Sequence, residues 1–133
     1  MVRFGYTILY VENVEGAIAF YENAFGFSRK FISPDNDYGE LNTGETTLSF
    51  ASKKLAKSNL KDGFIESKLE EKPFAIEVGF ITDNVAELVQ KATSFGAMLV
   101  SEPKQKPWGQ IVAYVRDLDG FLIEICTPVE GQV

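Results

Sequence analysis

The sequence predicts an α+β protein built from two tandem β-α-β-β-β modules, which form curved mixed sheets around a cavity. Three observations support this: the chain repeats one pattern of residues twice, each copy joins an apolar strand to an amphipathic segment, and each copy closes with short strands separated by turn residues. The 133 residues suit one domain of ordinary size with a real core. We therefore expect a single domain over residues 1–133, with a first module at about 1–51, a connector at about 52–73, a second module at about 74–128 and a tail at 129–133.

The repeat begins with two apolar segments that read as opening strands, Tyr6–Val11 and Ile76–Thr82. When the two copies are aligned, Tyr6 falls on Glu77. An acidic residue followed by asparagine ends both segments, so the same boundary signal occurs twice at the same place.

Each opening strand is expected to lead into a helix. Asn13 and Asn84 precede apolar residues with helical spacing, and asparagine side chains cap helices by accepting hydrogen bonds from free backbone amides. Gly26 and Gly96 follow the two helical segments, in the position just past a helix end where glycine is common. Both modules therefore share the strand–helix unit.

Turn residues divide the second half of each module into short strands. Residues 42–45 precede a strand at 46–51, and residues 117–120 precede a strand at 121–127. The connector between the modules is polar and rich in lysine, and we expect a short helical turn within it.

Composition excludes several kinds of chemistry. The chain has no histidine, which rules out Ser-His-Asp and Cys-His nucleophilic catalysis and removes the commonest transition-metal ligand. The net charge of −6 argues against nucleic-acid binding, which needs a basic surface. The single cysteine fits a reducing compartment, and no apolar run reaches membrane-spanning length. We expect a cytoplasmic protein that contacts neither nucleic acid nor membrane.

Two glutamates interrupt strands that are otherwise apolar. Glu77 lies between Ile76 and Val78, and Glu124 lies between Ile123 and Ile125. A carboxylate in a buried strand costs free energy unless something compensates for it. These two residues are therefore the first candidates for a functional site.

Strand alternation groups these glutamates with polar residues of the first module. Apolar residues on one face of each sheet are expected to pack on the helices, and the other face is expected to line the cavity. The predicted cavity wall consists of Tyr6, Tyr10, Ser49, Glu77 and Glu124. A small polar cluster in a mostly apolar pocket is typical of a small-molecule site.

Residues near the mouth of this cavity are further candidates. Trp108 and Tyr38 fall on each other in the repeat, and each either stacks on a ligand or packs over the edge of the core. Gln110 joins the ligand-binding residues if the strand register turns it inward. Arg116 is expected at the surface or in a turn, and Cys126 is expected to be an inert buried thiol.

The two modules, the Phe-Tyr-Glu sequence at residues 20–22 and the D-x-D-G-x-x-I-E sequence at residues 117–124 resemble the vicinal oxygen chelate superfamily. This family includes glyoxalases, bleomycin-resistance proteins and extradiol dioxygenases. The resemblance implies a homodimer in which modules of different chains close the cavity.

The resemblance also implies where a metal would bind. In metal-dependent relatives, ligands occupy four places that correspond here to Tyr6, Ser49, Glu77 and Glu124. Tyr6 and Ser49 depart from the usual ligands of the family. Two carboxylates alone are too few for firm binding of zinc or nickel.

We expect a small-molecule-binding protein of the glyoxalase/bleomycin-resistance type, with an acidic, metal-free cavity and no cofactor. One alternative is a lyase, isomerase or dioxygenase that uses a divalent cation (Mg, Mn, Fe, Zn or Ni) to act on vicinal oxygens, with Glu77 and Glu124 as metal ligands or catalytic acid and base. Another is an interaction domain whose cavity is vestigial. Metal-free acid–base catalysis by the same two glutamates also remains open.

Overall fold

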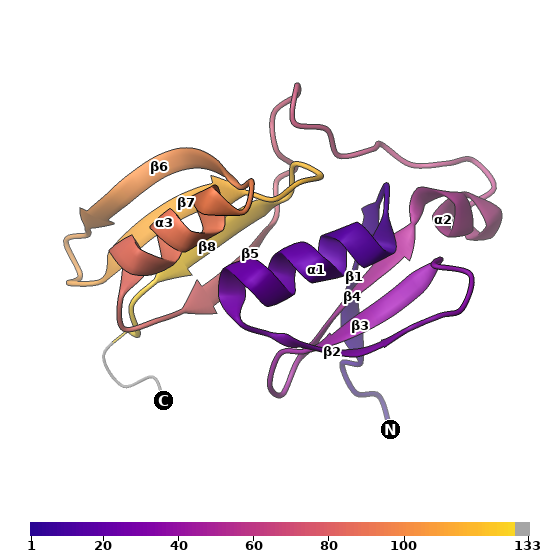
Figure 1. Cartoon of the computed structure of the whole chain (residues 1–133), viewed down its shortest axis with the longest axis horizontal. Helices are drawn as coiled ribbons and strands as arrows, with labels where there is room; N and C mark the ends of the chain where they lie inside the picture. Colours follow the sequence, from indigo (N-terminus) through magenta and orange to yellow (C-terminus); the bar gives the residue numbers. More distant parts are fainter. Residues whose placement is uncertain (130–133) are drawn as a thin grey trace. The chain divides into compact units, whose positions relative to one another are not determined.

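The computed structural model describes residues 1–129, and the predicted tail beyond Val129 lies outside the described residues. The chain divides into two compact units, Met1–Glu66 and Ser67–Val133, which are drawn in purple and in orange to yellow in Figure 1. Each unit carries one mixed four-stranded sheet. The sequence correctly predicted this α+β fold with its two β-α-β-β-β modules.

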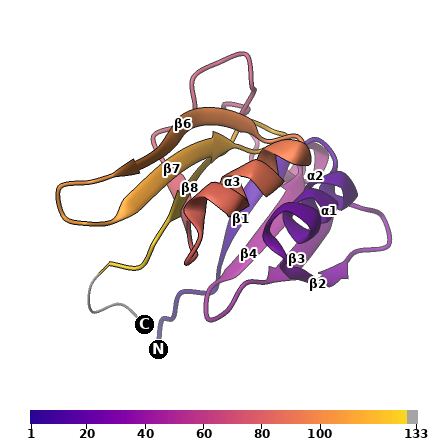
Figure 2. The ribbon, with the colours of Figure 1, turned by 60° about the vertical axis from the view of Figure 1, so that its left-hand side comes forward.

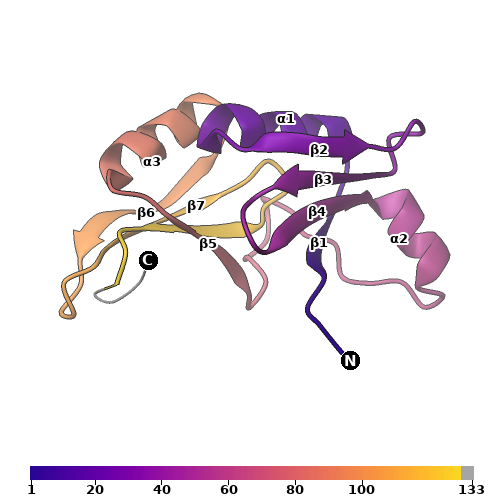
Figure 3. The same cartoon turned by 90° about the horizontal axis from the view of Figure 1, so that it is seen from below.

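The first unit places one long helix on its sheet. Its elements are β1 (Tyr6–Val11), α1 (Val14–Phe25), β2 (Ser28–Ile32), β3 (Tyr38–Asn42), β4 (Thr47–Ser52) and α2 (Lys53–Asn59). The strand order is β1-β4-β3-β2, in which β1 and β4 are parallel and the other pairs are antiparallel. Figure 3 shows α1 running along one face of this sheet, while α2 follows β4 at the end of the strand.

The second unit repeats the arrangement without a counterpart of α2 among its described residues. Its elements are β5 (Glu77–Ile81), α3 (Val85–Ser94), β6 (Met98–Gln105), β7 (Ile111–Arg116) and β8 (Leu122–Cys126). The strand order is β5-β8-β7-β6, again with one parallel pair, β5 and β8. In Figure 2, α3 lies across one face of this sheet.

The predicted helix boundaries are confirmed by their hydrogen bonds. Asn13 Oδ1 accepts from the amide of Gly16, and Asn84 Oδ1 accepts from the amide of Glu87. Gly26 caps α1 with a φ of 77°, a left-handed conformation that glycine adopts without strain.

Strand register shows how the two units correspond. Ser49 lies opposite Ile8 in the first sheet, as Glu124 lies opposite Gly79 in the second. Ser49 and Glu124 therefore occupy equivalent places, as the resemblance to the superfamily implied.

The predicted correspondence between Tyr38 and Trp108 is wrong. Tyr38 pairs with Ala51, whose equivalent Cys126 pairs with Val112. Val112 is thus the counterpart of Tyr38, and Trp108 lies in the turn before β7. The sequence alignment missed this because the connections before β3 and β7 differ.

The helix-facing sides of both sheets form the cores. Buried core residues in the first unit include Leu9, Val11, Val14, Ile18, Tyr21, Leu41 and Phe50, and those in the second include Val85, Val89, Ala92, Val115, Ile123 and Ile125. Ile76 was expected on the packed face, but it precedes β5 and is 62% exposed.

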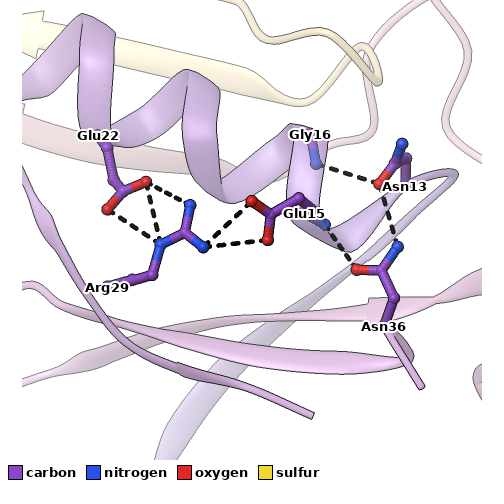
Figure 4. A network of polar contacts seen from close by, with 6 residues as sticks. All are labelled: Asn13, Glu15, Gly16, Glu22, Arg29 and Asn36. Carbon is purple, nitrogen blue, oxygen red and sulfur yellow. Dashed lines mark hydrogen bonds and ion pairs between the residues drawn. The ribbon is translucent and has the colours of Figure 1, made fainter. Parts of the chain in front are cut away.

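A polar network joins α1 to β2 and the following loop (Figure 4). The Arg29 guanidinium forms ion pairs with Glu15 at 3.0 Å and Glu22 at 2.7 Å. Asn36 accepts a hydrogen bond from the Glu15 amide and donates one to Asn13 Oδ1. These contacts fix the start of α1 over the edge strand. None of the helices within residues 1–129 is long and apolar enough to cross a membrane.

Candidate functional site: a carboxyl pair on the second sheet

The candidate site lies on the face of the second sheet that is turned away from α3. Glu77 and Gly79 share this face of β5, because side chains alternate along a strand. Glu124 of β8 lies opposite Gly79 on one side and opposite Tyr114 of β7 on the other. Gly79 has no atoms within 4 Å of where its Cβ would be, which leaves room beside the two glutamates.

The two carboxyl groups interact directly. Glu77 and Glu124 lie on the same face of neighbouring strands, and each shifts the pKa of the other. Tyr114 Oη donates a hydrogen bond to Glu124 Oε1 at 3.1 Å. Glu124 is therefore held between Glu77 on one neighbouring strand and Tyr114 on the other.

The pKa values of the two glutamates shift in opposite directions. Loss of hydration, followed by the hydrogen bond to Glu124 and the charge of Glu124, raises the pKa of Glu77 above its ordinary value. Burial favours a higher pKa for Glu124 as well, but interactions with the side chains of Cys126, Glu77 and Tyr114 outweigh it and lower the pKa. Of the two, Glu77 therefore holds its proton to the higher pH.

Two neighbours of the pair are held in their neutral forms. Burial, together with the hydrogen bond to Glu124, raises the pKa of Tyr114 to about 12. Burial, followed by the interaction with Glu124, raises the pKa of Cys126 to about 11. Both residues remain protonated near neutral pH: Tyr114 donates to Glu124, and the Cys126 thiol donates to the Phe80 carbonyl at 3.7 Å.

The predicted residues Trp108 and Gln110 lie beside this cluster in the second unit. Gln110 Nε2 donates to the Thr127 carbonyl at 2.8 Å, and its Oε1 accepts from Trp108 Nε1 at 2.8 Å. Burial raises the pKa of the Cys126 thiol, and the Gln110 side chain has a smaller, opposite effect. Trp108 is 64% exposed.

The remaining predicted residues gather on the equivalent face of the first unit. Tyr38 Oη donates to Glu40 Oε2 at 2.6 Å, and burial followed by this bond raises the pKa of Tyr38 to about 12. The nearby Ser49 hydroxyl has a weaker, opposite effect. Ser49 Oγ is fully buried and makes no hydrogen bond of regular geometry with any residue in 1–129. Tyr6 lies on the same face and is 54% exposed.

Tyr10 differs from the other predicted wall residues. Its ring packs edge-to-face against Phe64 of the connector, with the ring centroids 4.8 Å apart. The connector therefore covers Tyr10 within the first unit. That all these residues share one hollow with the second-unit pair stays a prediction.

Sequence reasoning missed Tyr114 and Glu40, which occupy equivalent places opposite Glu124 and Ser49. Alternation along residues 111–116 could have placed Tyr114 on one of the two faces. Choosing the face requires the register between β7 and β8, which the sequence does not supply.

Arg116 was expected at the surface or in a turn, but only 4% of it is exposed. Its guanidinium donates to the carbonyls of Gly120 at 2.8 Å, Lys68 at 2.8 Å and Leu69 at 3.2 Å. It fastens the chain before β5 to the turn between β7 and β8. Arg116 therefore has a structural role, because its guanidinium is bonded to backbone carbonyls and is buried away from any ligand.

Comparison with known proteins identifies the family. Residues 4–130 match a family model described as a glyoxalase-like domain, and the chain belongs to this family. The fold is similar to that of a glyoxalase-related enzyme from Fulvimarina pelagi, with a TM-score of 0.81, 18% sequence identity and coverage of 96% of this chain and 89% of that one. Comparison with curated protein sequences gives no match.

Two further solved structures are similar. A glyoxalase/bleomycin resistance protein/dioxygenase family enzyme from Burkholderia phytofirmans PsJN has a TM-score of 0.80 and 20% identity, covering 95% of this chain and 98% of its own. The hypothetical protein SA1046 from S. aureus has a TM-score of 0.80 and 23% identity, with coverage of 96% and 95%. At these identities the likeness concerns the fold alone.

The donor set of the second unit does not fit the metal centre that the family implies. Residues 1–129 contain no group of three His, Cys, Asp or Glu side chains placed to hold a metal ion. The two carboxyl groups have each other, a phenol and a protonated thiol as their polar neighbours. Structural and catalytic zinc sites use at least three protein ligands, chiefly thiolate, imidazole and carboxylate.

Proposed function

We propose that the chain is a small-molecule-binding protein of the glyoxalase/bleomycin-resistance type, and that Glu77 and Glu124 bind an organic cation. The proposal is carried by one observation: two carboxyl groups from neighbouring strands lie on the same sheet face and shift each other's pKa in opposite directions. Such a pair gains from any ligand that brings positive charge and N–H donors, because charge-assisted hydrogen bonds replace a strained contact between like groups.

Binding uses the ionised form of both side chains. An approaching cation favours that form, and both carboxylates then accept N–H bonds from the ligand. Tyr114 keeps Glu124 in place throughout, because its hydroxyl remains protonated well above neutral pH. No covalent step is required of the protein.

Charge also bears on which ligands are excluded. The net charge of −6 and the acidic pair favour cations and disfavour anions. A substrate that carries several carboxylates, such as lactoylglutathione, is a poor match. The expected homodimer belongs to the same proposal, and light scattering of the purified protein measures it.

A second candidate function is metal-free acid–base catalysis. It is favoured by the opposed pKa shifts, since neighbouring carboxyl groups whose pKa values are pushed apart can serve as acid and base. Glu77 would deliver the proton and Glu124 would accept one. Turnover of a bound ligand, followed by mass spectrometry, separates this candidate from simple binding.

The experiment measures cation binding to the full chain by calorimetry, with metal-free bleomycin as a cationic glycopeptide probe. Glu124→Gln is expected to weaken binding by about tenfold or more, since it removes one partner of a charge-assisted bond. Glu71→Gln is the matched control, because Glu71 lies exposed in a loop of the same unit.

Equal affinity for bleomycin in the wild type, Glu124→Gln and Glu71→Gln would contradict the proposal. Metal analysis of protein purified without chelator tests the metal-dependent alternative directly. Stoichiometric metal that Glu124→Gln removes would favour the lyase or dioxygenase reading over the binding protein.

A further inference from the structure

Residues 60–66 follow α2 and end the first unit, and we call this segment the strap. It belongs to neither a helix nor a strand. Within residues 1–129, its backbone hydrogen bonds lie at its start, from the Leu60 amide to the Ala56 carbonyl and from the Gly63 amide to the Leu60 carbonyl. The rest of the strap is therefore held by side chains rather than by its backbone.

Two side-chain contacts hold the strap on the first unit. The ring of Phe64 packs edge-to-face on Tyr10, with the ring centroids 4.8 Å apart. The Glu66 carboxylate forms ion pairs with Lys53 at 3.2 Å and with Lys57 at 3.4 Å, both on α2. One apolar contact and one group of ion pairs thus close the strap.

The ion pairs of Glu66 can be broken without leaving a buried charge alone. Lys53 is the more enclosed member, since 15% of its side chain is exposed against 31% for Glu66. Lys53 also forms an ion pair with Glu12 at 3.2 Å, so its ammonium group keeps a partner when Glu66 leaves. Water and salt weaken ion pairs that are partly exposed, so this contact is easily broken.

The strap covers one end of the polar face of the first sheet. Tyr10 lies opposite Ala51, which shares its face of β4 with Ser49 two residues earlier. Phe64 is the side chain that the strap places on this face. Ile65 gives the strap no second apolar anchor, because it is 78% exposed.

We propose that the strap opens and closes over Tyr10, and that the ion pairs of Glu66 keep it closed. In the open form, Phe64 leaves Tyr10 and one end of the polar face is uncovered. The strap therefore controls access to this face of the first unit. The inference goes beyond the proposed function, because it requires neither Glu77 nor Glu124.

Digestion of the full chain by chymotrypsin tests this, because the enzyme must bind an aromatic side chain in its own pocket before it cleaves. Phe64 has to leave Tyr10 before the bond between Phe64 and Ile65 can be cut. The rate of this cut therefore follows the open population. Mass spectrometry identifies the fragments. Cleavage after Phe4, which is 76% exposed and precedes β1, is the internal standard for the activity of the protease.

Glu66→Gln is expected to speed the cut after Phe64 about fivefold relative to the cut after Phe4, because it removes the ion pairs that close the strap. Glu70→Gln is the matched control, because Glu70 is an exposed acid four residues further along the chain. Raising the salt concentration from about 0.1 M to about 1 M screens the same ion pairs. The wild type and Glu66→Gln are then expected to be cut at similar rates.

Three results would overturn the inference. The first is an equal rate of cleavage after Phe64 in the wild type and Glu66→Gln at low salt. The second is a salt effect on this cut that is as large in Glu66→Gln as in the wild type. The third concerns Phe50, which is fully buried in β4. If Glu66→Gln speeds cleavage after Phe50 as much as after Phe64, the first unit unfolds as a whole and the strap does not open separately.

Discussion

Glu77 and Glu124 show how two identical side chains acquire opposite properties from their neighbours. Burial favours the neutral form of Glu124, but its interactions with the side chains of Cys126, Glu77 and Tyr114 outweigh it and stabilise the ionised form. Tyr114 donates a hydrogen bond to this carboxylate. Glu77 has Glu124 as its main polar neighbour, so ionisation brings it next to a negative charge. The difference depends on strand order, since β8 lies between two strands and β5 lies at the sheet edge.

The raised pKa of Glu77 makes the carboxyl contact dependent on pH. Its stabilisation is fully present below the ordinary pKa of 4.5 and is lost as the pH rises through the raised value. Glu77→Gln is therefore expected to raise the melting temperature by about 2 °C near neutral pH, and to change it little at acid pH. Melting curves measured across this pH range check the expectation.

Glu124→Gln provides the opposite case. The pKa of Glu124 is lowered, so its stabilisation is present at neutral pH and is lost as the pH falls through that lowered value. This variant should melt below wild type near neutral pH. A stabilising effect of both substitutions at neutral pH would contradict the opposite pKa shifts of Glu77 and Glu124.

At the scale of elements, the sequence predicted the strands and helices well but could not supply their register. Asn13 and Asn84 carry a local signal, because a cap needs only the next three residues. Tyr114 carries no such signal, because its partner Glu124 is ten residues away across a turn. Trp108 was wrongly aligned with Tyr38 because the sequence gives no strand register there either.

Arg116 shows that a buried charge can stabilise the boundaries of secondary-structure elements by hydrogen bonding to backbone carbonyls. Three backbone carbonyls, of Lys68, Leu69 and Gly120, depend on its guanidinium. Arg116→Met fills a similar volume but leaves these acceptors without their donor, so we expect a loss of about 3 kcal/mol of unfolding free energy.

Urea unfolding of the full chain measures this loss. Arg29→Met is the control, because Arg29 is partly exposed and its ion pairs with Glu15 and Glu22 are screened by water, so its effect should stay within about 1 kcal/mol. Equal effects of the two substitutions would show that the connector does not depend on Arg116.

At the scale of the whole molecule, duplication explains the two equivalent polar faces. Each unit keeps its helix-facing side apolar and places polar residues on the other side, and the sequence predicted this division from alternation alone. The first unit bears Tyr38, Glu40 and Ser49 where the second bears Val112, Tyr114 and Glu124. The chemistry of each face depends on these differences between equivalent residues of the two units. A repeat pattern alone could not predict them.

The net charge of −6 implies that salt affects ligand binding. Attraction between an acidic protein and a cation weakens as ionic strength rises, because the screening length falls from about 10 Å at 0.1 M to about 3 Å at 1 M. We expect the affinity for metal-free bleomycin to fall by severalfold over this range, as measured by calorimetry. Binding that strengthens with salt would indicate apolar contact without charge recognition.

The position of Cys126 has a consequence for following the two units separately. The chain has one cysteine, and it is buried in β8 with a pKa raised to about 11. A protonated, enclosed thiol reacts slowly with alkylating reagents, since the thiolate is the nucleophile. The rate at which this sulfur is labelled therefore measures how often the second sheet opens transiently. Similar motions of the first sheet do not change this rate.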